Sequence, residues 1–522
     1  MKVAIIGGGG TRTPILVKGL LEQEEDLKLE EICLYDIDPE RLSLISLVLE
    51  ELLEEVQPAN SRVSLRYAQN LKEALKGSSF VFLTMRVGKE EMRILDERIP
   101  LSLGLIGQET VGAGGAALAV RTVPKVLEIA RLIQEECPSA WVINFTNPSG
   151  MVTEALLNFS PLERVVGICD GPSSIKALLS RFLEVPEEEI FLDYFGLNHL
   201  GWVRGIFVRG EDYLPKVMKY LPMFPAIEKL VQFPVDFLLK LRMIPNPYLR
   251  YYYFPEKVLE EMRREPQTRG EKVKEMNEAL FAALKEGKRK PLEVYQDYIW
   301  RRESRGGFLG GRRPRGGFFG RRGSSRGEAG SGESHGEFMG REGSSGERAE
   351  NGEFLGREGS SGEKAGGGEF SREEAGSGEF SGPRAGSGES DYGEAEEGFT
   401  LEEGEGYIKV ALELLRGLSG FKVGTPVVNV KNRSAILGME ENDVVEVPVH
   451  LLKGFVRPVA CGSVPQECLE LMKRVKLYEK KLIQGIVEGS PEGIIEAMSL
   501  NPLIGSLDLA TQLWGQVLQS RI

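Results

Sequence analysis

The N-terminal residues alternate between apolar and glycine-rich segments in an order typical of nucleotide-binding proteins. Residues 2–6 (KVAII) form an apolar run that predicts a short buried strand, and four glycines follow at 7–10. The next segment has apolar residues at helical spacing over 15–21, with Thr13 expected as the N-cap and Pro14 at the first helical position. Strand, glycine-rich turn and helix in this order predict the start of a dinucleotide-binding fold.

The four glycines, Gly7, Gly8, Gly9 and Gly10, form the predicted cofactor-binding loop. They let the backbone approach a pyrophosphate, which the free N–H groups at the start of the following helix would hold. Gly7 and Gly9 fit the first two glycines of the dinucleotide-binding fingerprint, whereas Arg12 stands at its third position. A glycine-rich turn that binds no nucleotide is the alternative interpretation.

A second apolar run, at 31–35, predicts another strand, which ends at Asp36. An acid at the end of this strand in a dinucleotide-binding fold can accept hydrogen bonds from the adenosine ribose hydroxyls. The sequence therefore predicts NAD as the cofactor, with Asp36 at its ribose.

Two further apolar runs, at 164–169 and 190–195, predict strands that are each followed by a candidate metal ligand. Cys169 ends the first run, next to Asp170, and His199, one of only three histidines in the chain, follows the second. A thiolate and a neutral imidazole suit a divalent cation and leave positions open for substrate oxygens. We expect both side chains at the same sheet edge. Taken singly, each could instead be a buried core residue.

In the middle of the chain the α/β pattern stops. Residues 301–397 are largely Gly, Ser, Glu and Arg with scattered Phe, and the triplet Gly-Glu-Phe recurs in them. So few branched apolar residues cannot bury enough surface to offset the entropy of ordering, which predicts a disordered insert. After it, 407–415 has helical periodicity, 426–430 and 444–448 are typical of strands, and the tail from 465 is mostly helical.

These patterns predict an α/β protein with two domains and an insert. A Rossmann-type dinucleotide-binding domain, 1–190, is followed by an α+β domain for substrate binding and oligomerisation. The disordered low-complexity insert, 301–397, divides this second domain into a first part, 191–300, and a second part, 398–522.

Composition and charge reduce the number of protein classes and cellular compartments that fit this chain. The chain has 522 residues and a net charge of −13, which argues against a protein that wraps duplex nucleic acid. Five scattered cysteines indicate a reducing compartment rather than a disulfide scaffold. Neither a signal peptide nor an apolar stretch of membrane-spanning length is visible, so we expect a cytoplasmic protein without a membrane partner.

The first part of the insert is basic and carries Arg-Gly-Gly at 305–307 and 315–317. Such segments can bind RNA through charge and stacking. The later half of the insert is acidic and would repel phosphate. We therefore favour a solvated linker and do not expect a nucleic-acid partner.

Several motifs stand out along the chain beyond these patterns. They are the glycine-rich start, 93–100 (RILDERIP), 107–110 (GQET), 143–148 (INFTNP), Cys169-Asp170, 196–199 (GLNH) and 248–253 (YLRYYY). Together they resemble glycoside hydrolase family 4, most closely its 6-phospho-β-glucosidases. The similarity covers about 1–300 and 404–522, and the insert has no counterpart in the family pattern.

The resemblance implies hydrolysis of 6-phospho-glycosides, such as a phosphorylated disaccharide or glucoside, with NAD and a divalent metal, usually manganese. The nicotinamide takes a hydride from sugar C3, which acidifies the proton on C2. A base removes that proton, the glycosidic bond breaks by elimination, water adds and the hydride returns. Cys169 and His199 would be the metal ligands. Family members commonly assemble as dimers or tetramers, so a homo-oligomer is expected.

The resemblance also suggests an acid and a base for catalysis. Asp170 matches an acid that assists the leaving group, although it could also cap a helix that begins near Ile175. Many β-glucosidases of the family have Asn at this position, so an α-linked substrate remains open. Tyr407 matches the catalytic base, and Glu109 matches an acid that raises the basicity of this tyrosine.

The catalytic tyrosine of the family lies in an Arg-Gly-Gly-x-x-Tyr motif. Here Tyr407 follows Gly-Glu-Gly at 404–406, whereas Arg-Gly-Gly stands at 305–307, before the insert. The insert therefore divides the motif. If the insert displaced Tyr407, the fold and cofactor site would persist while catalysis failed.

Three more residues match substrate-binding positions of the family. Arg93 and Asn147 are the first two, and a helix-surface cation is the alternative interpretation of Arg93. Lys431 stands where the family commonly has Arg, and it would attract a phosphate as a point charge.

Two other functions stay open. A plain NAD-dependent dehydrogenase would share the nucleotide-binding start, but it would need no Cys-His pair and would consume NAD stoichiometrically. A catalytically impaired relative would use the insert as an RNA-binding or protein-binding arm.

Overall fold

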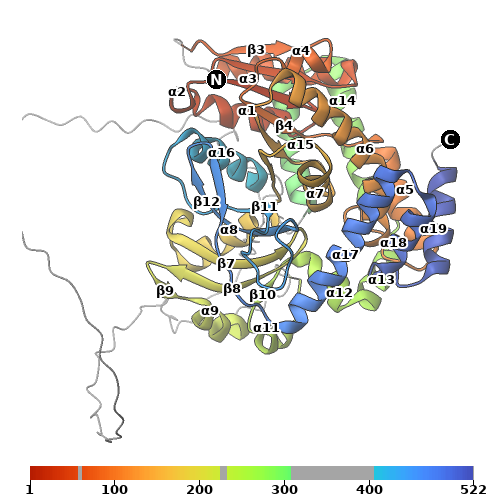
Figure 1. Cartoon of the computed structure of the whole chain (residues 1–522). Helices are drawn as coiled ribbons and strands as arrows, with labels where there is room; N and C mark the ends of the chain where they lie inside the picture. The colour runs from red at the N-terminus through yellow and green to blue at the C-terminus, as the bar shows by residue number, and fades with distance from the viewer. Residues whose placement is uncertain (57–60, 224–231, 307–404, 521–522) are drawn as a thin grey trace, which may run out of the picture. The chain divides into compact units, whose positions relative to one another are not determined.

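The computed structural model of the chain describes residues 1–56, 61–223, 232–306 and 405–520 (Figure 1). The predicted insert, apart from its first six residues, lies outside the described residues. Those six belong to a helix that ends only at Gly306.

The apolar run at the N-terminus forms the first strand of a nine-stranded sheet. Successive side chains point to opposite faces of a strand, so Val3 and Ile5 enter one apolar cluster while Ala4 and Ile6 enter another. Both faces of the sheet are therefore buried beneath helices, as a parallel sheet requires.

Six strands of this sheet are parallel and follow the order β3-β2-β1-β4-β5-β6. They are β1 (Lys2–Ile6), β2 (Glu31–Tyr35), β3 (Ser64–Tyr67), β4 (Phe80–Leu83), β5 (Trp141–Asn144) and β6 (Val165–Gly167). This order is that of the Rossmann fold, with its topological switch point between β1 and β4. The predicted fold class is confirmed.

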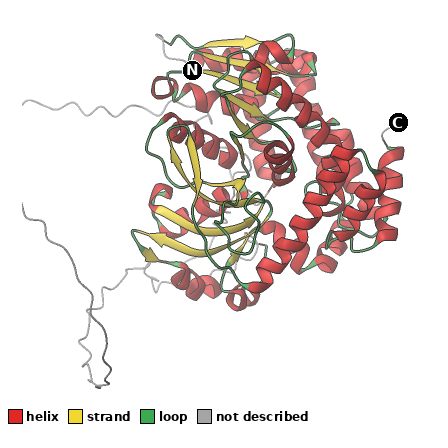
Figure 2. Cartoon of the chain, in the orientation of Figure 1, coloured by secondary structure: helices red, strands yellow, loops and turns green. Residues whose placement is uncertain are grey.

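Helices connect these strands and cover both faces of the sheet (Figure 2). They are α1 (Thr13–Leu21), α2 (Glu24–Leu27), α3 (Pro39–Val56), α4 (Leu71–Leu75), α5 (Lys89–Ser102), α6 (Gly112–Glu136), α7 (Ser149–Phe159) and α8 (Gly171–Leu183).

Three strands from the part of the chain after the insert extend the same sheet beyond β6. They are β11 (Val427–Lys431), β12 (Val444–Leu452) and β13 (Phe455–Pro458), all in antiparallel pairing. The second part of the predicted substrate domain thus shares a sheet with the nucleotide-binding domain. Strand β11 pairs with β6 at one position, where Asn429 lies opposite Gly167.

A second, smaller sheet packs against the first, with β7 next to β12 (Figure 1). Its strands are β7 (Ile190–Leu197), β8 (Leu200–Val208), β9 (Glu211–Asp212) and β10 (Ile244–Pro245). Its helices are α9 (Leu214–Tyr220), α11 (Val235–Leu241), α12 (Arg250–Tyr253) and α13 (Pro255–Arg264).

The remaining helices surround these two sheets. They are α14 (Arg269–Glu286), α15 (Pro291–Gly306), α16 (Glu405–Ser419), α17 (Gln466–Glu488), α18 (Pro491–Leu500) and α19 (Leu507–Gln519). α17 packs against α6, α19 packs against α5 and α6, and α18 packs against α17 and α19; Figure 1 shows these three helices in blue. Among the helices that the structure describes, none is long and apolar enough to cross a membrane.

Two helix starts differ from the sequence prediction. α1 has Arg12 rather than Thr13 at its N-cap position, with no capping hydrogen bond from the side chain. α8 begins at Gly171, before the predicted Ile175. In both helices a proline occupies the first turn, where its missing N–H costs no intrahelical hydrogen bond, so the helix extends back through it.

Candidate active site

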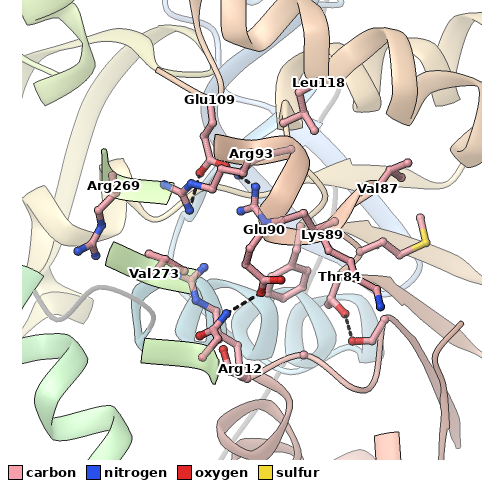
Figure 3. Close-up of a pocket in the computed structure, with 18 of the residues that line it drawn as sticks. Arg12, Thr84, Val87, Lys89, Glu90, Arg93, Glu109, Leu118, Arg269 and Val273 are labelled. Atoms are coloured by element: carbon pink, nitrogen blue, oxygen red, sulfur yellow. Dashed lines mark hydrogen bonds and ion pairs between the residues drawn. The ribbon is translucent and has the colours of Figure 1, made fainter. Parts of the chain in front are cut away.

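The candidate residues gather at the carboxyl edge of the parallel strands. The glycine loop follows β1, Asp36 follows β2, Asn147 follows β5 and Cys169 follows β6. Parallel strands end at one edge of their sheet, where α/β proteins bind ligands. A cavity of about 1340 Å³ opens there, and Figure 3 shows part of its wall.

The glycine loop is shaped by backbone hydrogen bonds and by Asp36. The N–H groups of Gly7 and Gly8 both donate to the Tyr35 carbonyl at 2.9 Å, and Gly9 N–H donates to Asp36 Oδ2 at 2.9 Å. Gly7 has φ +97°, and a Cβ there would lie 2.8 Å from the Thr84 backbone. The loop therefore needs glycine at this position, and Asp36 holds it open as a wall of the cavity.

His199 comes from the second sheet and not from the sheet edge that carries Cys169. Leu197 and Leu200 pair as the ends of β7 and β8, so Asn198 and His199 form a two-residue hairpin turn. His199 has φ +62° and is buried at 2% exposure. The expectation of one shared sheet edge is thus wrong, because the packing of two sheets assembles the pair.

The hydrogen bonds around His199 determine which ring nitrogen carries the proton. Gln108 Oε1 accepts hydrogen bonds from the backbone N–H groups of Thr110, at 2.6 Å, and Val111, at 2.9 Å, so this atom is the amide oxygen. The single hydroxyl proton of Thr110 must then be donated to the same oxygen, at 2.8 Å. Thr110 Oγ1 therefore accepts from His199 Nδ1–H at 2.9 Å, which leaves Nε2 deprotonated.

Nε2 of His199 is a buried lone pair with no hydrogen-bond partner among the described residues. Burial lowers the pKa of His199 to about 4, so the ring is neutral at physiological pH. The Tyr248 ring lies parallel to it, with the ring centroids 3.7 Å apart at an angle of 4°. A neutral imidazole with a fixed ring plane and a free Nε2 is what a divalent cation requires of this ligand.

Cys169 supplies the second candidate ligand. Its thiol is buried, and burial together with the charge of Asp170 raises its pKa well above 9.0. The charge of Cys169 also raises the pKa of Tyr248, the residue that stacks on His199, so Tyr248 is close to both candidate ligands. The described residues contain no group of three or more His, Cys, Asp or Glu side chains that could hold a metal. The pair fits a cation that takes its other ligands from substrate or water.

Replacing Thr110 with Val is expected to weaken binding of Mn²⁺ by about 10- to 100-fold, because the acceptor that fixes the His199 tautomer is lost. Titration of the purified protein with Mn²⁺ would measure this change. Thr110→Ser keeps the hydroxyl and should bind nearly as tightly as the wild type. Equal affinity in Thr110→Val would contradict the assignment of Nε2 as the ligand atom.

Tyr407 lies in the cavity even though the insert precedes it in the chain. It stands in the first turn of α16, is 7% exposed, and lines the cavity together with Asp170. Its ring stacks on Phe145 with a centroid distance of 6.0 Å, and the Arg12 guanidinium lies 4.9 Å from its centroid. Burial and the charges of Asp170 and Cys169 raise the pKa of Tyr407, and Arg12 opposes this.

Glu109 is held by arginines rather than by the tyrosine. It forms ion pairs with Arg86 and with Arg93 Nη1, the latter at 3.2 Å, and Figure 3 shows Glu109 and Arg93 next to each other. Although Glu109 is buried, the charges of Arg86, Arg93 and Arg12 lower its pKa to about 2. Arg12 lowers the pKa of both Glu109 and Tyr407, so it links these two residues electrostatically.

Arg93 is not a surface cation of its helix. Its side chain is 10% exposed and also pairs with Glu97, with Nε 2.9 Å from Oε1. Arg93 and Asn147 both line the cavity. The alternative interpretation of Arg93 is therefore wrong, because α5 turns this side chain toward buried carboxylates.

Asp170 occupies the N-cap position of α8, but its side chain makes no capping hydrogen bond. Its carbonyl oxygen accepts hydrogen bonds from Ser174 N–H, at 2.8 Å, and from the Ser173 hydroxyl, at 2.9 Å. Its carboxylate lies beside the thiol, with Oδ1 3.7 Å from Cys169 Sγ. The capping interpretation therefore holds for the position and not for the carboxylate, which faces the site.

The structure does not bring Lys431 to these residues. β11 runs antiparallel to β6, and Asn429 lies opposite Gly167. Lys431 is thus level with the beginning of β6, whereas Cys169 lies beyond its end, about four residues or roughly 13 Å further along. The described residues that line the cavity do not include Lys431.

Four residues of the site were not assigned a role by sequence reasoning: Arg12, Arg86, Thr110 and Tyr248. Arg12 had a signal, because it departs from the glycine fingerprint, and Thr110 and Tyr248 lie within two of the motifs. Nothing in the spacing of these residues indicates that they contact His199, Glu109 or Tyr407.

Family models match nearly the whole chain. The model described as family 4 glycosyl hydrolase matches residues 2–185, and the model of the family 4 glycosyl hydrolase C-terminal domain matches residues 194–504.

Individual relatives are similar over the full length. A probable 6-phospho-beta-glucosidase of Bacillus subtilis (strain 168) is 28% identical over 530 residues, covering 100% of this chain and 96% of that protein. The solved 6-phospho-beta glucosidase of Thermotoga maritima with manganese, NAD⁺ and glucose-6-phosphate has a TM-score of 0.71 at 25% identity, covering 100% of this chain and 98% of that one. A 6-phospho-alpha-glucosidase from gut microorganisms, in complex with NAD and Mn²⁺, has a TM-score of 0.69 at 27% identity, with coverage of 100% and 98%.

Proposed function

The chain belongs to family 4 of the glycosyl hydrolases, and we propose that it hydrolyses 6-phospho-glycosides with two cofactors, NAD and a divalent cation. Manganese is the cation that we propose. The preferred substrate of the proposal is a 6-phospho-β-glucoside. Its support is that relatives matched over their full length in Bacillus subtilis and Thermotoga maritima are named 6-phospho-beta-glucosidases.

One observation carries this proposal: a single cavity joins the nucleotide loop to the candidate acid and base. Gly7, Gly9 and Asp36 line one region of it, and Asp170 and Tyr407 line another. A dinucleotide held by the loop would therefore share its space with a sugar held next to Asp170. Ordinary glycosidases need only the sugar site, whereas hydride chemistry during hydrolysis needs both.

The residues present fit the two cofactors. The loop 7–10 would hold the pyrophosphate of NAD, and Cys169 with Nε2 of His199 would hold the cation. When bound, NAD supplies a reversible hydride acceptor and the cation supplies a Lewis acid.

In this proposal Asp170 is the proton donor to the leaving glycosidic oxygen and Tyr407 takes the proton from sugar C2. Tyr407 must first lose its own proton, although burial and the charges of Asp170 and Cys169 raise its pKa. The charge of Asp170 is absent while Asp170 carries the proton that it donates. Coordination of the Cys169 thiolate to a cation would cancel one of these charges. Arg12, over the ring, favours the phenolate.

Glu109, Arg93 and Asn147 would position the sugar. The buried Glu109 carboxylate stays ionised and fixes the guanidinium of Arg93 by an ion pair of 3.2 Å. A fixed guanidinium and the Asn147 amide present donors to sugar oxygens without reorganisation during the reaction. An effect of Glu109 on Tyr407 would pass through Arg12, whose charge lowers the pKa of both.

A 6-phospho-α-glucosidase is the second candidate. Asp170, where many β-specific members have Asn, favours it, and a gut-microorganism relative of similar coverage is named for the α-anomer. Both candidates share the cofactors and the phosphorylated sugar. The proposal further includes a homo-oligomer in the cytoplasm, and the five free thiols of the chain support a reducing compartment.

The test is hydrolysis of p-nitrophenyl 6-phospho-β-glucoside and of its α-anomer by the purified full chain, with and without NAD and Mn²⁺. We expect release of nitrophenol only with both additives, and no net formation of reduced NAD. Stoichiometric reduction of NAD would identify a plain dehydrogenase instead. If neither anomer released nitrophenol while NAD and Mn²⁺ still bound, the protein would be a catalytically impaired relative.

Deleting residues 308–404 is expected to preserve cofactor binding and most of the activity. The deletion joins Arg-Gly-Gly at 305–307 to Glu405-Gly-Tyr407 and so restores the Arg-Gly-Gly-x-x-Tyr spacing. The matched comparison is deletion of 301–397, which also removes Arg302. Arg302 Nη1 donates to the Tyr298 hydroxyl at 2.6 Å and lines the cavity, so this second variant should bind NAD less tightly.

Nucleotide binding and nitrophenol release would be measured for both deletions. Loss of activity in the variant without 308–404, with its NAD affinity intact, would show that this segment contributes to catalysis and would contradict the prediction.

A further inference from the structure

Glu446 is a buried carboxylate that the proposed reaction does not use. It lies on β12, opposite Asn429 of β11, and is 0% exposed. Its Oε2 accepts a hydrogen bond from the Tyr194 hydroxyl at 2.7 Å, and its Oε1 accepts from Nδ2 of Asn198 at 3.1 Å and of Asn429 at 3.2 Å. Among the described residues no ion pair includes Glu446. Burial raises the pKa of Glu446 to about 7, because only neutral donors surround the ionised carboxylate.

The contact with Asn198 connects Glu446 to the surroundings of both proposed metal ligands. Asn198 precedes His199 in the hairpin turn, and its side chain also lowers the pKa of the Cys169 thiol, which places it near that residue. Its Oδ1 accepts from Gly150 N–H, at 3.3 Å, in the first turn of α7. Asn198 is therefore held at both ends of its amide, by Gly150 N–H and by the Glu446 carboxyl.

The contact with Tyr194 connects Glu446 to the tyrosine that stacks on His199. The Tyr194 hydroxyl, which donates to Glu446, accepts a hydrogen bond from Asn246 Nδ2 at 3.4 Å. Asn246, itself fully buried, accepts from the Tyr248 backbone N–H at 3.1 Å. Tyr248 carries the ring that stacks on His199 at 3.7 Å.

Both chains of contacts cross between the two sheets. Cys169 follows β6 of the first sheet, whereas His199 lies in a turn of the second, so their relative position depends on how the two sheets pack. Glu446 belongs to the first sheet and hydrogen-bonds two residues of the second, Tyr194 and Asn198.

We propose that Glu446 is a positioning residue that fixes His199 relative to Cys169 and, when ionised, supplies a negative charge near the cation that these two residues hold. The inference rests on the proposed function, because it needs a cation at this pair. Outer-shell hydrogen bonds of this kind orient metal ligands and contribute to metal affinity.

The test is direct titration of the full chain with Mn²⁺, without substrate, for the wild type and for Glu446→Gln. Gln has the same shape and keeps one acceptor oxygen for the two Asn amides, so the variant mainly loses the charge. We expect the dissociation constant for Mn²⁺ to rise by about 10- to 100-fold, with NAD affinity unchanged.

Two further variants separate positioning from general destabilisation. Tyr194→Phe breaks only the chain of contacts that ends at Tyr248, and it should raise the dissociation constant by a smaller factor. Glu154→Gln is the matched control, because Glu154 is a buried carboxylate whose oxygens accept from Lys476 Nζ and Val444 N–H. Among the described residues its side chain forms no hydrogen bond with Cys169, His199 or Asn198. Its Mn²⁺ affinity should stay at the wild-type value.

The outcomes distinguish this inference from the proposed function. Wild-type protein that binds no Mn²⁺ would overturn the metal site itself. A wild type that binds Mn²⁺, with equal affinity in Glu446→Gln, would overturn only the role of Glu446. If Glu446→Gln does not fold, Tyr194→Phe decides, and an unchanged dissociation constant there overturns the inference. An equal loss of affinity in Glu154→Gln would also overturn it.

Discussion

Replacing His199 with Gly is expected to abolish Mn²⁺ binding and to lower the rate of 6-phospho-glucoside hydrolysis by roughly 10³-fold or more. The imidazole Nε2 is the one ligand atom of the pair that is already deprotonated, because Thr110 accepts the Nδ1 proton. Cys169 alone, with its raised pKa, would have to release a proton and bind the cation unaided. Glycine suits the φ of +62° at this turn, so the loss would not come from backbone strain.

The matched control is His450→Ala, which removes an exposed imidazole from β12, away from the cavity. Its Mn²⁺ affinity and hydrolysis rate should equal those of the wild type. NAD affinity should be unchanged in both variants, because the glycine loop does not contact His199. Substantial hydrolysis by His199→Gly in a metal-free buffer would contradict the proposal that hydrolysis requires a metal ion.

The fold could be predicted because its signals are local in the sequence. Each signal occupies only a few residues: the apolar runs 2–6 and 31–35 and the glycines 7–10. The order of strands and helices in a parallel βαβ protein then allows few topologies. The pairing of β11 with β6 could not be predicted in this way. It joins Asn429 to Gly167 across most of the chain, and its antiparallel direction carries Lys431 away from the site.

The candidate site shows the same division. Cys169 and Asp170 could be placed because residues after parallel strands meet at one edge, and Tyr407 could be placed through a family motif. Thr110 and Glu446 could not, because their roles depend on hydrogen bonds between elements far apart in sequence. The periodicity of apolar residues in a sequence does not indicate which carbonyl or hydroxyl group a buried side chain will contact.

Replacing Tyr407 with Phe is expected to lower kcat by about 10²- to 10⁴-fold, with little change in the binding of NAD or Mn²⁺. The phenylalanine ring keeps the packing on Phe145 and under the Arg12 guanidinium, so the variant removes only the hydroxyl. Exchange of the substrate C2 proton with deuterium from D₂O should fall in parallel, because the same hydroxyl oxygen takes that proton. Nitrophenol release and mass spectrometry of the recovered sugar would measure the two effects.

Tyr251→Phe provides the matched control for Tyr407→Phe. Tyr251 is another tyrosine that lines the same cavity, and desolvation raises its pKa to about 12, so it is a second phenol that could act as the base. The difference lies in their surroundings: Tyr407 has Arg12 over its ring and is near Cys169, whose charge a bound cation would cancel. Tyr251→Phe should therefore retain both hydrolysis and C2 exchange. If Tyr251→Phe lost exchange while Tyr407→Phe kept it, the base would be Tyr251, and the position of Tyr407 after the insert would have no catalytic consequence.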